Sequence, residues 1–279
     1  MKAEKILIIA QEVAPYVQES EMAEMCLKLA LQAQEKGRQV RMFMPRWAFI
    51  NERRNQLHEV IRLSGMNLII DGNDHALIIK VASVGTTRLQ VYFIDNDDYF
   101  QGRGAKNDGP DAEYADNVER AIFFVRGVLE TVKKLRWMPD VIHCHGKIAS
   151  LAPLFIKTAF HDDPPYTDAR VVFSTYGDAP TDAPAANFAR ALRFRSLDEK
   201  AIKKLGVDLT SAESSVDLAL KFSDAFIHSA DNPASNAVFE RAVKMGLPTL
   251  SFPDTQLNGE VNPQAYLDFY DTLMPADEA

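Results

Sequence analysis

The sequence is short of cysteine and of long apolar runs, and each shortage excludes a class of protein. Cys26 and Cys144 are the only cysteines, and each lies in an apolar segment. Buried thiols of this kind are typical of a reducing compartment, not of a disulfide-stabilised secreted protein. No run approaches about 18 apolar residues, so we expect no transmembrane helix. The first apolar run ends at Gln11, is too short for a signal peptide and lacks a cleavage site, which predicts a cytoplasmic protein.

Basic residues and glycine are also scarce. The chain has 31 Lys and Arg against 39 Asp and Glu, a formal net charge of −8. A negative net field repels nucleic acids and anionic membranes, so we expect neither as a partner. Glycine supplies only 13 of 279 residues, against a typical ~7%. That is low for a protein that binds phosphates in glycine-rich loops.

The apolar content is ordinary, and its pattern predicts the fold. With 47% hydrophobic and 25% charged residues, the chain can form a core and is not disordered. Its length allows one large α/β domain or two small ones. We expect strands over 5–10, 39–45, 57–63, 76–84, 89–94, 140–144, 170–174, 225–227 and 248–252. We expect helices over 22–33, 111–135, 148–160, 216–222, 234–245 and 263–273, and loops over 101–113 and 177–184.

This alternation predicts an α/β fold with a doubly wound, mostly parallel, Rossmann-like sheet in three α/β/α layers. Turn signals without a helix between about 57 and 95 predict a β-hairpin insertion. Ligands bind such sheets at the carboxyl ends of the strands. We expect the segments 11–21, 95–99, 143–147 and 174–178 to meet at this crevice.

The loop after the first strand leads into a helix N-terminus, which is often an anion site. Here that position holds Glu19, Glu21 and Glu24, and no glycine occurs between Gln11 and Gly37. Carboxylates suit the positive end of a helix dipole and repel a pyrophosphate. We therefore expect a self-capped helix and no phosphate site.

His143 and His145 bracket Cys144 at the end of an expected strand. Alternate residues share a face of a strand, so both imidazoles can point into the crevice. Zinc would need one or two further ligands, and none is evident, so we predict no metal. Either a ligand contact or satisfied strand-end histidines fit the pattern. No G-x-S-x-G elbow is present, and a thiol in an apolar strand is usually inert, so we name no catalytic residue.

A basic cluster lies in the second half of the chain. It is consistent with a solvated helix face or with a site for an acidic partner or phosphate, and it is interrupted by Asp198 and Glu199. Its members are Arg190, Arg193, Arg195, Lys200, Lys203 and Lys204.

Four segments resemble bacterial glycogen synthases and plant starch synthases. They read K-I-L-I-I-A-Q-E-V-A-P-Y, V-Y-F-I-D-N-D-D-Y-F-Q-G-R-G, Y-A-D-N-V-E-R-A-I-F-F and W-M-P-D-V-I-H-C-H. The likeness runs from Lys5 to about Gly259. It implies the N-terminal half of a GT-B enzyme that transfers glucose from ADP-glucose to an α-1,4-glucan with retention and without a catalytic metal or other cofactor.

The positions that carry chemistry in that family differ here. The resemblance implies Lys-x-Gly-Gly-Leu in the first loop, where this chain has Gln18, Glu19, Ser20, Glu21 and Met22. The family's His-x-His-Asp-Trp becomes a sequence ending in His145, Gly146 and Lys147, and its Thr-x-His-Asn turn becomes Ser174, Thr175, Tyr176 and Gly177. Losing one preorganised charge-stabilising group commonly costs roughly 10²–10³-fold in rate.

We therefore expect a synthase-related acceptor-side domain over 1–260, a C-terminal helix and tail over 261–279, and no donor-binding domain. The resemblance implies that the family's crevice survives in outline, and its candidate ligand-binding residues are Glu12, Gln18, Asp95, Asp116, His143, His145, Lys147 and Tyr176. Capping of strand ends and bonding within loops is the alternative role for these residues. One hypothesis is a protein without transferase activity that has a binding or regulatory role in α-glucan metabolism. Its partners would be ADP-glucose or α-glucan, bound weakly or not at all, or a protein partner, including a second copy. The alternative hypothesis is a glucosyltransferase completed by a partner chain that carries the donor domain.

Overall fold

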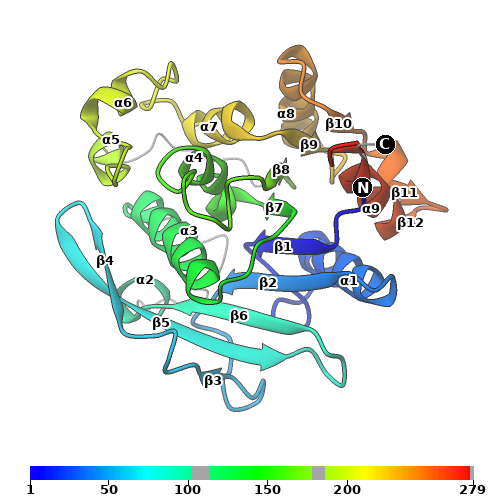
Figure 1. Cartoon of the computed structure of the whole chain (residues 1–279), viewed down its shortest axis with the longest axis horizontal. Coiled ribbons are helices and arrows are strands. Elements are labelled where there is room, and N and C mark those ends of the chain that lie inside the picture. The colour runs from blue at the N-terminus through cyan, green and yellow to red at the C-terminus, as the bar shows by residue number, and fades with distance from the viewer. Residues whose placement is uncertain (102–113, 178–185, 277–279) are drawn as a thin grey trace.

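The computed structural model describes residues 1–101, 114–177 and 186–276, and a ten-stranded sheet forms its centre (Figure 1). The spatial order is β10-β9-β8-β7-β1-β2-β6-β5-β3, with β4 paired to β5. The strands are β1 (Lys5–Ala10), β2 (Gln39–Pro45), β3 (His58–Glu59), β4 (Met66–Ile70), β5 (Asn73–Ser83), β6 (Gln90–Asp95), β7 (Val141–His145), β8 (Arg170–Ser174), β9 (Ala225–Ile227) and β10 (Thr249–Leu250). A separate hairpin joins β11 (Gln256–Leu257) and β12 (Glu260–Val261).

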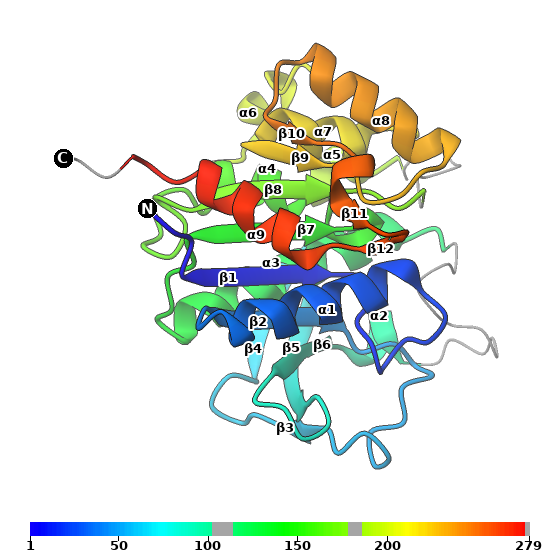
Figure 2. The ribbon, with the colours of Figure 1, turned by 90° about the vertical axis from the view of Figure 1, so that its right-hand side faces the viewer.

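Helices cover both faces of the sheet. Figure 2 shows α1 and α9 in front of the central strands and α3 behind them. The helical segments are α1 (Glu21–Glu35), α2 (Asp97–Phe100), α3 (Asn117–Lys134), η1 (Lys147–Ala149), α4 (Ala152–Lys157), α5 (Phe188–Ala191), α6 (Glu199–Lys203), α7 (Ser214–Phe222), α8 (Pro233–Lys244), η2 (Pro253–Thr255) and α9 (Pro263–Thr272). The predicted three-layer α/β fold is confirmed.

The sheet reverses its winding at β1. Strand β1 pairs in parallel with β2 on one side and with β7 on the other, and β5 runs antiparallel to β6. The backbone N–H of Gln11 donates to the carbonyl of His145 at 3.3 Å, so the loop after β1 begins beside the end of β7. This switch point is where an open α/β sheet forms its ligand crevice.

Local sequence explains the elements beside this crevice. Ile6 to Ala10 of β1 are fully buried, as expected of a central strand covered on both faces. Helix α1 begins at Ser20, whose hydroxyl accepts from the N–H of Ala23. On the other face, Gly127 lets α3 approach β5 and β6 closely, because a Cβ there would lie 2.9 Å from a methyl of Leu77.

Several predicted boundaries are wrong. A single strand over 57–63 does not form; β3 has two residues, and the unpredicted β4 pairs with β5 instead. The helix expected over 148–160 is the short α4, since Pro153 stands in its first turn and proline is tolerated there but not in a helix interior. The short α2, α5 and α6 and the β11–β12 hairpin were not predicted. Most of the two predicted loops, and the start of the helix expected at 111, lie outside the described residues.

Helix α9 returns the end of the chain to its beginning. The Asp271 carboxylate accepts two hydrogen bonds from Arg38, both at 2.8 Å, and a third from the N–H of Ala3. Figure 1 shows the N-terminus beside this helix. This docking seats the buried side chains of Tyr266 and Tyr270 against the carboxyl end of β7 and the residues after β9.

Candidate functional site

The structure brings His143 and His145 together at the end of β7. Both are fully buried, and the two ring centroids lie 3.6 Å apart. Nδ1 of His143 lies 2.6 Å from the Tyr270 hydroxyl, and its Nε2 lies 2.8 Å from the Ser174 hydroxyl. The predicted shared face is confirmed, and α9 packs against His143 through Tyr270.

The hydrogen-bond directions assign the tautomer of His143. Ser174 donates its one proton to the carbonyl of Ile227 at 2.9 Å. It must therefore accept from the imidazole, so Nε2 of His143 carries the proton. Nδ1 is then an acceptor, and the Tyr270 hydroxyl donates to it. Both ring nitrogens of His143 are thus satisfied within the chain.

His145 is only partly satisfied. Its Nδ1 lies 3.0 Å from the hydroxyl of Tyr176. Its Nε2 is buried and has no hydrogen-bond partner among the described residues. A buried polar group left without a partner costs about 1–3 kcal/mol, which makes this atom an open position in an otherwise paired cluster.

Burial keeps the histidine pair neutral. It lowers the pKa of His145 to about 3. Burial, together with the neighbouring His145, holds the pKa of His143 well below its ordinary value. Burial also raises the pKa of Tyr270 and of Tyr176. At neutral pH this cluster therefore carries no charge with which to attract a ligand.

The loop after β1 is bonded to the start of α1. The buried Glu12 accepts a hydrogen bond from the Ser20 hydroxyl and, at 3.3 Å, from the side-chain amide of Gln11. Glu21 and Glu24 occupy the first turn of α1. Gln18 is exposed and lies two residues before Ser20, the N-cap of α1. The predicted capping of α1 is confirmed, with Ser20 as the capping residue.

Asp95 lies away from the histidine pair, at the end of β6. It is fully buried, and the Lys80 ammonium lies 2.7 Å from its carboxylate. Lys80 also pairs with Glu52 at 2.6 Å, and Arg46 pairs with Glu52 as well. These charges satisfy one another within the chain, so the position of Asp95 is that of a structural ion pair.

Lys147 follows His145 by two residues, at the start of η1, and is half-buried. With residues from α3 and from the loop after β2, it lines a cavity of about 40 Å³. The indole N–H of Trp47 donates to the carbonyl of Gln11 at 2.9 Å, and the Arg120 guanidinium lies 5.5 Å from the Trp47 ring. The lining residues are Gln11, Trp47, Asn117, Arg120, Ala121, Lys147 and Ile148. The half-buried Asp116 directly precedes α3.

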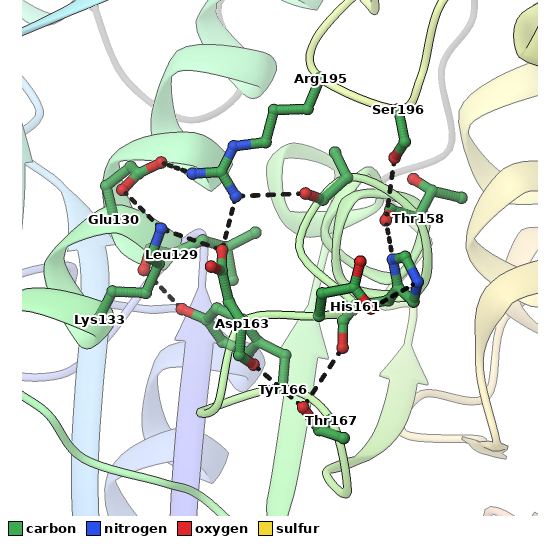
Figure 3. Close-up of polar contacts among 12 residues, drawn as sticks. Leu129, Glu130, Lys133, Thr158, His161, Asp163, Tyr166, Thr167, Arg195 and Ser196 are labelled. Carbon is green, nitrogen blue, oxygen red and sulfur yellow. Dashed lines mark hydrogen bonds and ion pairs between the residues drawn. The ribbon is translucent and has the colours of Figure 1, made fainter.

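The basic cluster is largely paired with acids of the same chain. Figure 3 shows Arg195 directed at Glu130 and Asp163, with contacts of 3.2 and 2.6 Å. Arg190 pairs with Asp71, Arg193 with Glu199 at 3.2 Å, and Lys203 with Glu199 at 2.7 Å. Arg190 and Arg195 join segments that are distant in the chain, which neither sequence interpretation anticipated. Arg193 and Lys203 pair with the nearby, exposed Glu199, as expected of a solvated face.

Within the described ranges, no group of three or more His, Cys, Asp or Glu side chains could hold a metal ion. In the same part of the chain, no helix is long and apolar enough to cross a membrane. Cys144 is fully buried, and burial raises its pKa, so it is not an activated nucleophile.

Sequence reasoning missed Trp47, Arg120, Tyr266 and Tyr270. The tyrosines lie on a helix that was predicted, and their spacing of four residues marks one buried face. Their contact with β7 was not predictable, because Tyr270 and His143 are 127 residues apart in the chain.

Comparison with known proteins identifies related chains. The family model described as the starch synthase catalytic domain matches residues 5–240. The glycogen synthase of Chlorobium limicola is 34% identical over 173 residues, covering 62% of this chain and 35% of the relative. That of Chlorobium phaeovibrioides is 38% identical over 159 residues, covering 57% and 32%. The chain therefore spans about a third of the length of these curated relatives.

A solved structure shows the same fold. The catalytic domain of Starch Synthase IV from Arabidopsis thaliana, bound to ADP and acarbose, matches with a TM-score of 0.69 and 19% sequence identity. The match covers 89% of this chain and 51% of that one.

Proposed function

The chain belongs to the family of the starch synthase catalytic domain, and from that premise we propose that it acts in α-glucan metabolism as a binding protein without glucosyl transfer. One observation carries this proposal. At the carboxyl end of β7, where such a sheet binds ligands, the two buried histidines bond to side chains of the same chain: His143 to Tyr270 and Ser174, and His145 to Tyr176. We assign 1–260 to the family's acceptor-side domain and 261–279 to a C-terminal helix and tail.

The first loop supports the loss of nucleotide-sugar binding. The resemblance implies a lysine and two glycines where this chain has Gln18, Ser20 and Glu21. Ser20 bonds to Glu12 and caps α1, while Glu21 adds a carboxylate to the same turn. A pyrophosphate placed at this helix start would face carboxylates where the family has a cation, which opposes binding.

The cavity beside Lys147 supports a residual binding role. Its volume of about 40 Å³ has room for a few water-sized groups and not for a pyranose ring. One aromatic wall, Trp47, and the polar side chains of Gln11, Asn117 and Arg120 suit a sugar hydroxyl. We therefore place an α-glucan across the rim of this cavity, with a hydroxyl group directed into it.

The test combines an activity assay with thermal melting. We expect no transfer of labelled glucose from ADP-glucose to maltoheptaose, a higher Tm with maltoheptaose, and no change with ADP or ADP-glucose. A ligand at 100 times its Kd adds about 2.7 kcal/mol of stability, which a melting curve resolves. Transfer by the chain alone overturns the loss of activity, and an unchanged Tm at millimolar maltoheptaose overturns glucan binding.

The second candidate is a transferase completed by a partner chain. This candidate requires an intact acceptor-side fold, and the chain shares the fold of the starch synthase catalytic domain with a TM-score of 0.69. Co-purification of the tagged protein from its native cells, followed by the same transfer assay on the eluate, distinguishes the two. Transfer that requires a second chain supports this candidate and overturns a purely binding role.

A further inference from the structure

The side chain of Tyr176 is directed at the histidine pair and contacts His145. The residue follows β8 and packs partly buried against the core. Its hydroxyl lies 3.0 Å from Nδ1 of His145, and its ring centroid lies 6.1 Å from that of His145. The hydroxyl thus joins the segment after β8 to His145 at the end of β7, at the carboxyl edge of the sheet where the crevice forms.

Helix α8 fixes Tyr176 in this orientation. Asn232, the N-cap of α8, donates from its side chain to the carbonyl of Tyr176 at 3.2 Å, and its side-chain oxygen accepts from the N–H of Ser235 at 3.0 Å. Gly177 makes this contact feasible, because it has a φ of +90° and a Cβ there would lie 2.6 Å from the Asn232 amide. The turn therefore depends both on a glycine and on the cap of the next helix.

His145, which the Tyr176 hydroxyl contacts, has one ring nitrogen without a hydrogen-bond partner among the described residues. His145 is fully buried, and its Nε2 has no hydrogen-bond partner within the part of the chain that the structure describes. By contrast, both nitrogens of His143 are bonded. The unpaired atom therefore belongs to the histidine whose other ring nitrogen, Nδ1, contacts the Tyr176 hydroxyl.

We propose that Tyr176 is a stopper: its ring fills the crevice over His145, and its hydroxyl takes the place of a ligand hydroxyl on that imidazole. Tyr176 thereby determines what the crevice admits. Without this side chain, the crevice accepts a small ring compound that carries one hydroxyl group. The proposal rests on the proposed function: it explains why the crevice at His145 takes no ligand, while the α-glucan lies at the separate cavity beside Lys147.

Chemical modification of the histidines tests the stopper. Diethyl pyrocarbonate acylates exposed imidazoles, and peptide mapping by mass spectrometry separates the six sites. His161, with 54% of its side chain exposed, is the internal reference. We expect His145 to be protected in the wild type and the Tyr176→Ala variant to raise its modification rate at least about tenfold, the effect of about 1.4 kcal/mol lost from a closed state.

Tyr176→Phe is the matched control. It keeps the ring and removes the hydroxyl, so the rate at His145 should rise by less than about fivefold, as expected for the loss of one hydrogen bond of below 1 kcal/mol. Addition of 4-methylphenol, which has the shape of the missing side chain, should restore protection in the Ala variant and leave the wild type unchanged. A merely structural role for Tyr176 would not produce this restoration.

The rates can be compared only between folded variants. Circular dichroism establishes that the variants are folded, and if Tyr176→Ala is not, the smaller truncation Tyr176→Leu takes its place with the same expected direction. Equal His145 rates in the wild type and the truncated variant overturn the stopper, as does a Phe variant that reacts as fast as the Ala variant. Glucosyl transfer by the wild type would instead overturn the proposed function, which is a separate measurement.

Discussion

The rings of His143 and His145 lie 3.6 Å apart, centroid to centroid. Two residues of one strand that share a face are about 7 Å apart along it, so the imidazoles lean toward each other. Tyr270 bonds one ring and Tyr176 bonds the other. Protonating either ring would place a charge in a dry site beside its neighbour, and both rings are therefore neutral.

This arrangement predicts acid sensitivity at mildly acidic pH. Both folded pKa values lie below the unfolded value of about 6.5, with that of His145 at about 3. The unfolded chain therefore binds more protons below pH 6.5, and stability falls as the pH falls from there toward 3. We expect up to about 1.4 kcal/mol of lost stability per pH unit for each histidine.

Urea unfolding at several pH values between 7 and 5 measures how the free energy of unfolding changes with pH. This range lies above the one in which most carboxylates titrate. In the His145→Gln variant this slope should be shallower by the equivalent of about one bound proton, about 1.4 kcal/mol per pH unit. The His161→Gln variant, altered at an exposed histidine, is the control and should keep the full slope. Equal slopes in all three proteins would contradict a neutral buried pair.

A second prediction concerns Gly177. Its alanine variant must adopt a φ of +90° and also place a Cβ 2.6 Å from Asn232. Gly246 has a similar φ of +77° but open space around its Cα. We expect Gly246→Ala to cost about 1 kcal/mol from backbone strain alone, and Gly177→Ala to cost at least about 1 kcal/mol more, from overpacking. Equal free energies of unfolding for the two variants would refute the close approach of Asn232.

A third prediction concerns the docking of α9. The two hydrogen bonds between Arg38 and Asp271 are largely shielded from water, with side-chain exposures of 9% and 22%. Removing one partner of such a pair should cost about 2–3 kcal/mol. We expect Asp271→Ala to lower the free energy of unfolding by this amount. The exposed pair of Lys203 and Glu199 is the control, and Lys203→Ala should cost about 0.5 kcal/mol or less.

The sequence predicted the layers of the fold because they depend on local patterns. Apolar runs such as 5–10 and 170–174 are strands with the predicted bounds, since a fully buried strand needs only a continuous apolar segment. The short elements were missed, because two-residue strands such as β3 have no periodicity to detect. In the candidate site, the pairing of His143 with His145 followed from their alternate spacing.

The partners of these residues could not be predicted, because they come from distant parts of the chain. Tyr270 reaches His143 only after α9 docks, and Trp47 reaches Gln11 from the loop after β2. The sequence predicts Asp95 as a crevice residue because it ends a strand. Its actual partner, Lys80, lies on an antiparallel strand whose register no local signal specifies.

The final prediction distinguishes a structural role of Asp95 from a ligand-binding one. Asp95 is fully buried against Lys80, and leaving one member of a buried ion pair unpaired costs about 3–5 kcal/mol. Here Glu52 also contacts Lys80 at 2.6 Å, so the ammonium keeps one counter-charge. We therefore expect Asp95→Asn to cost somewhat less, about 2–3 kcal/mol, and to leave the maltoheptaose-induced rise in Tm unchanged. The double variant Asp95→Leu with Lys80→Met removes both charges together. Its loss in free energy of unfolding should be smaller than the sum of the losses in the single variants Asp95→Leu and Lys80→Met. Loss of the Tm rise with intact stability in Asp95→Asn would instead place this carboxylate in the binding site.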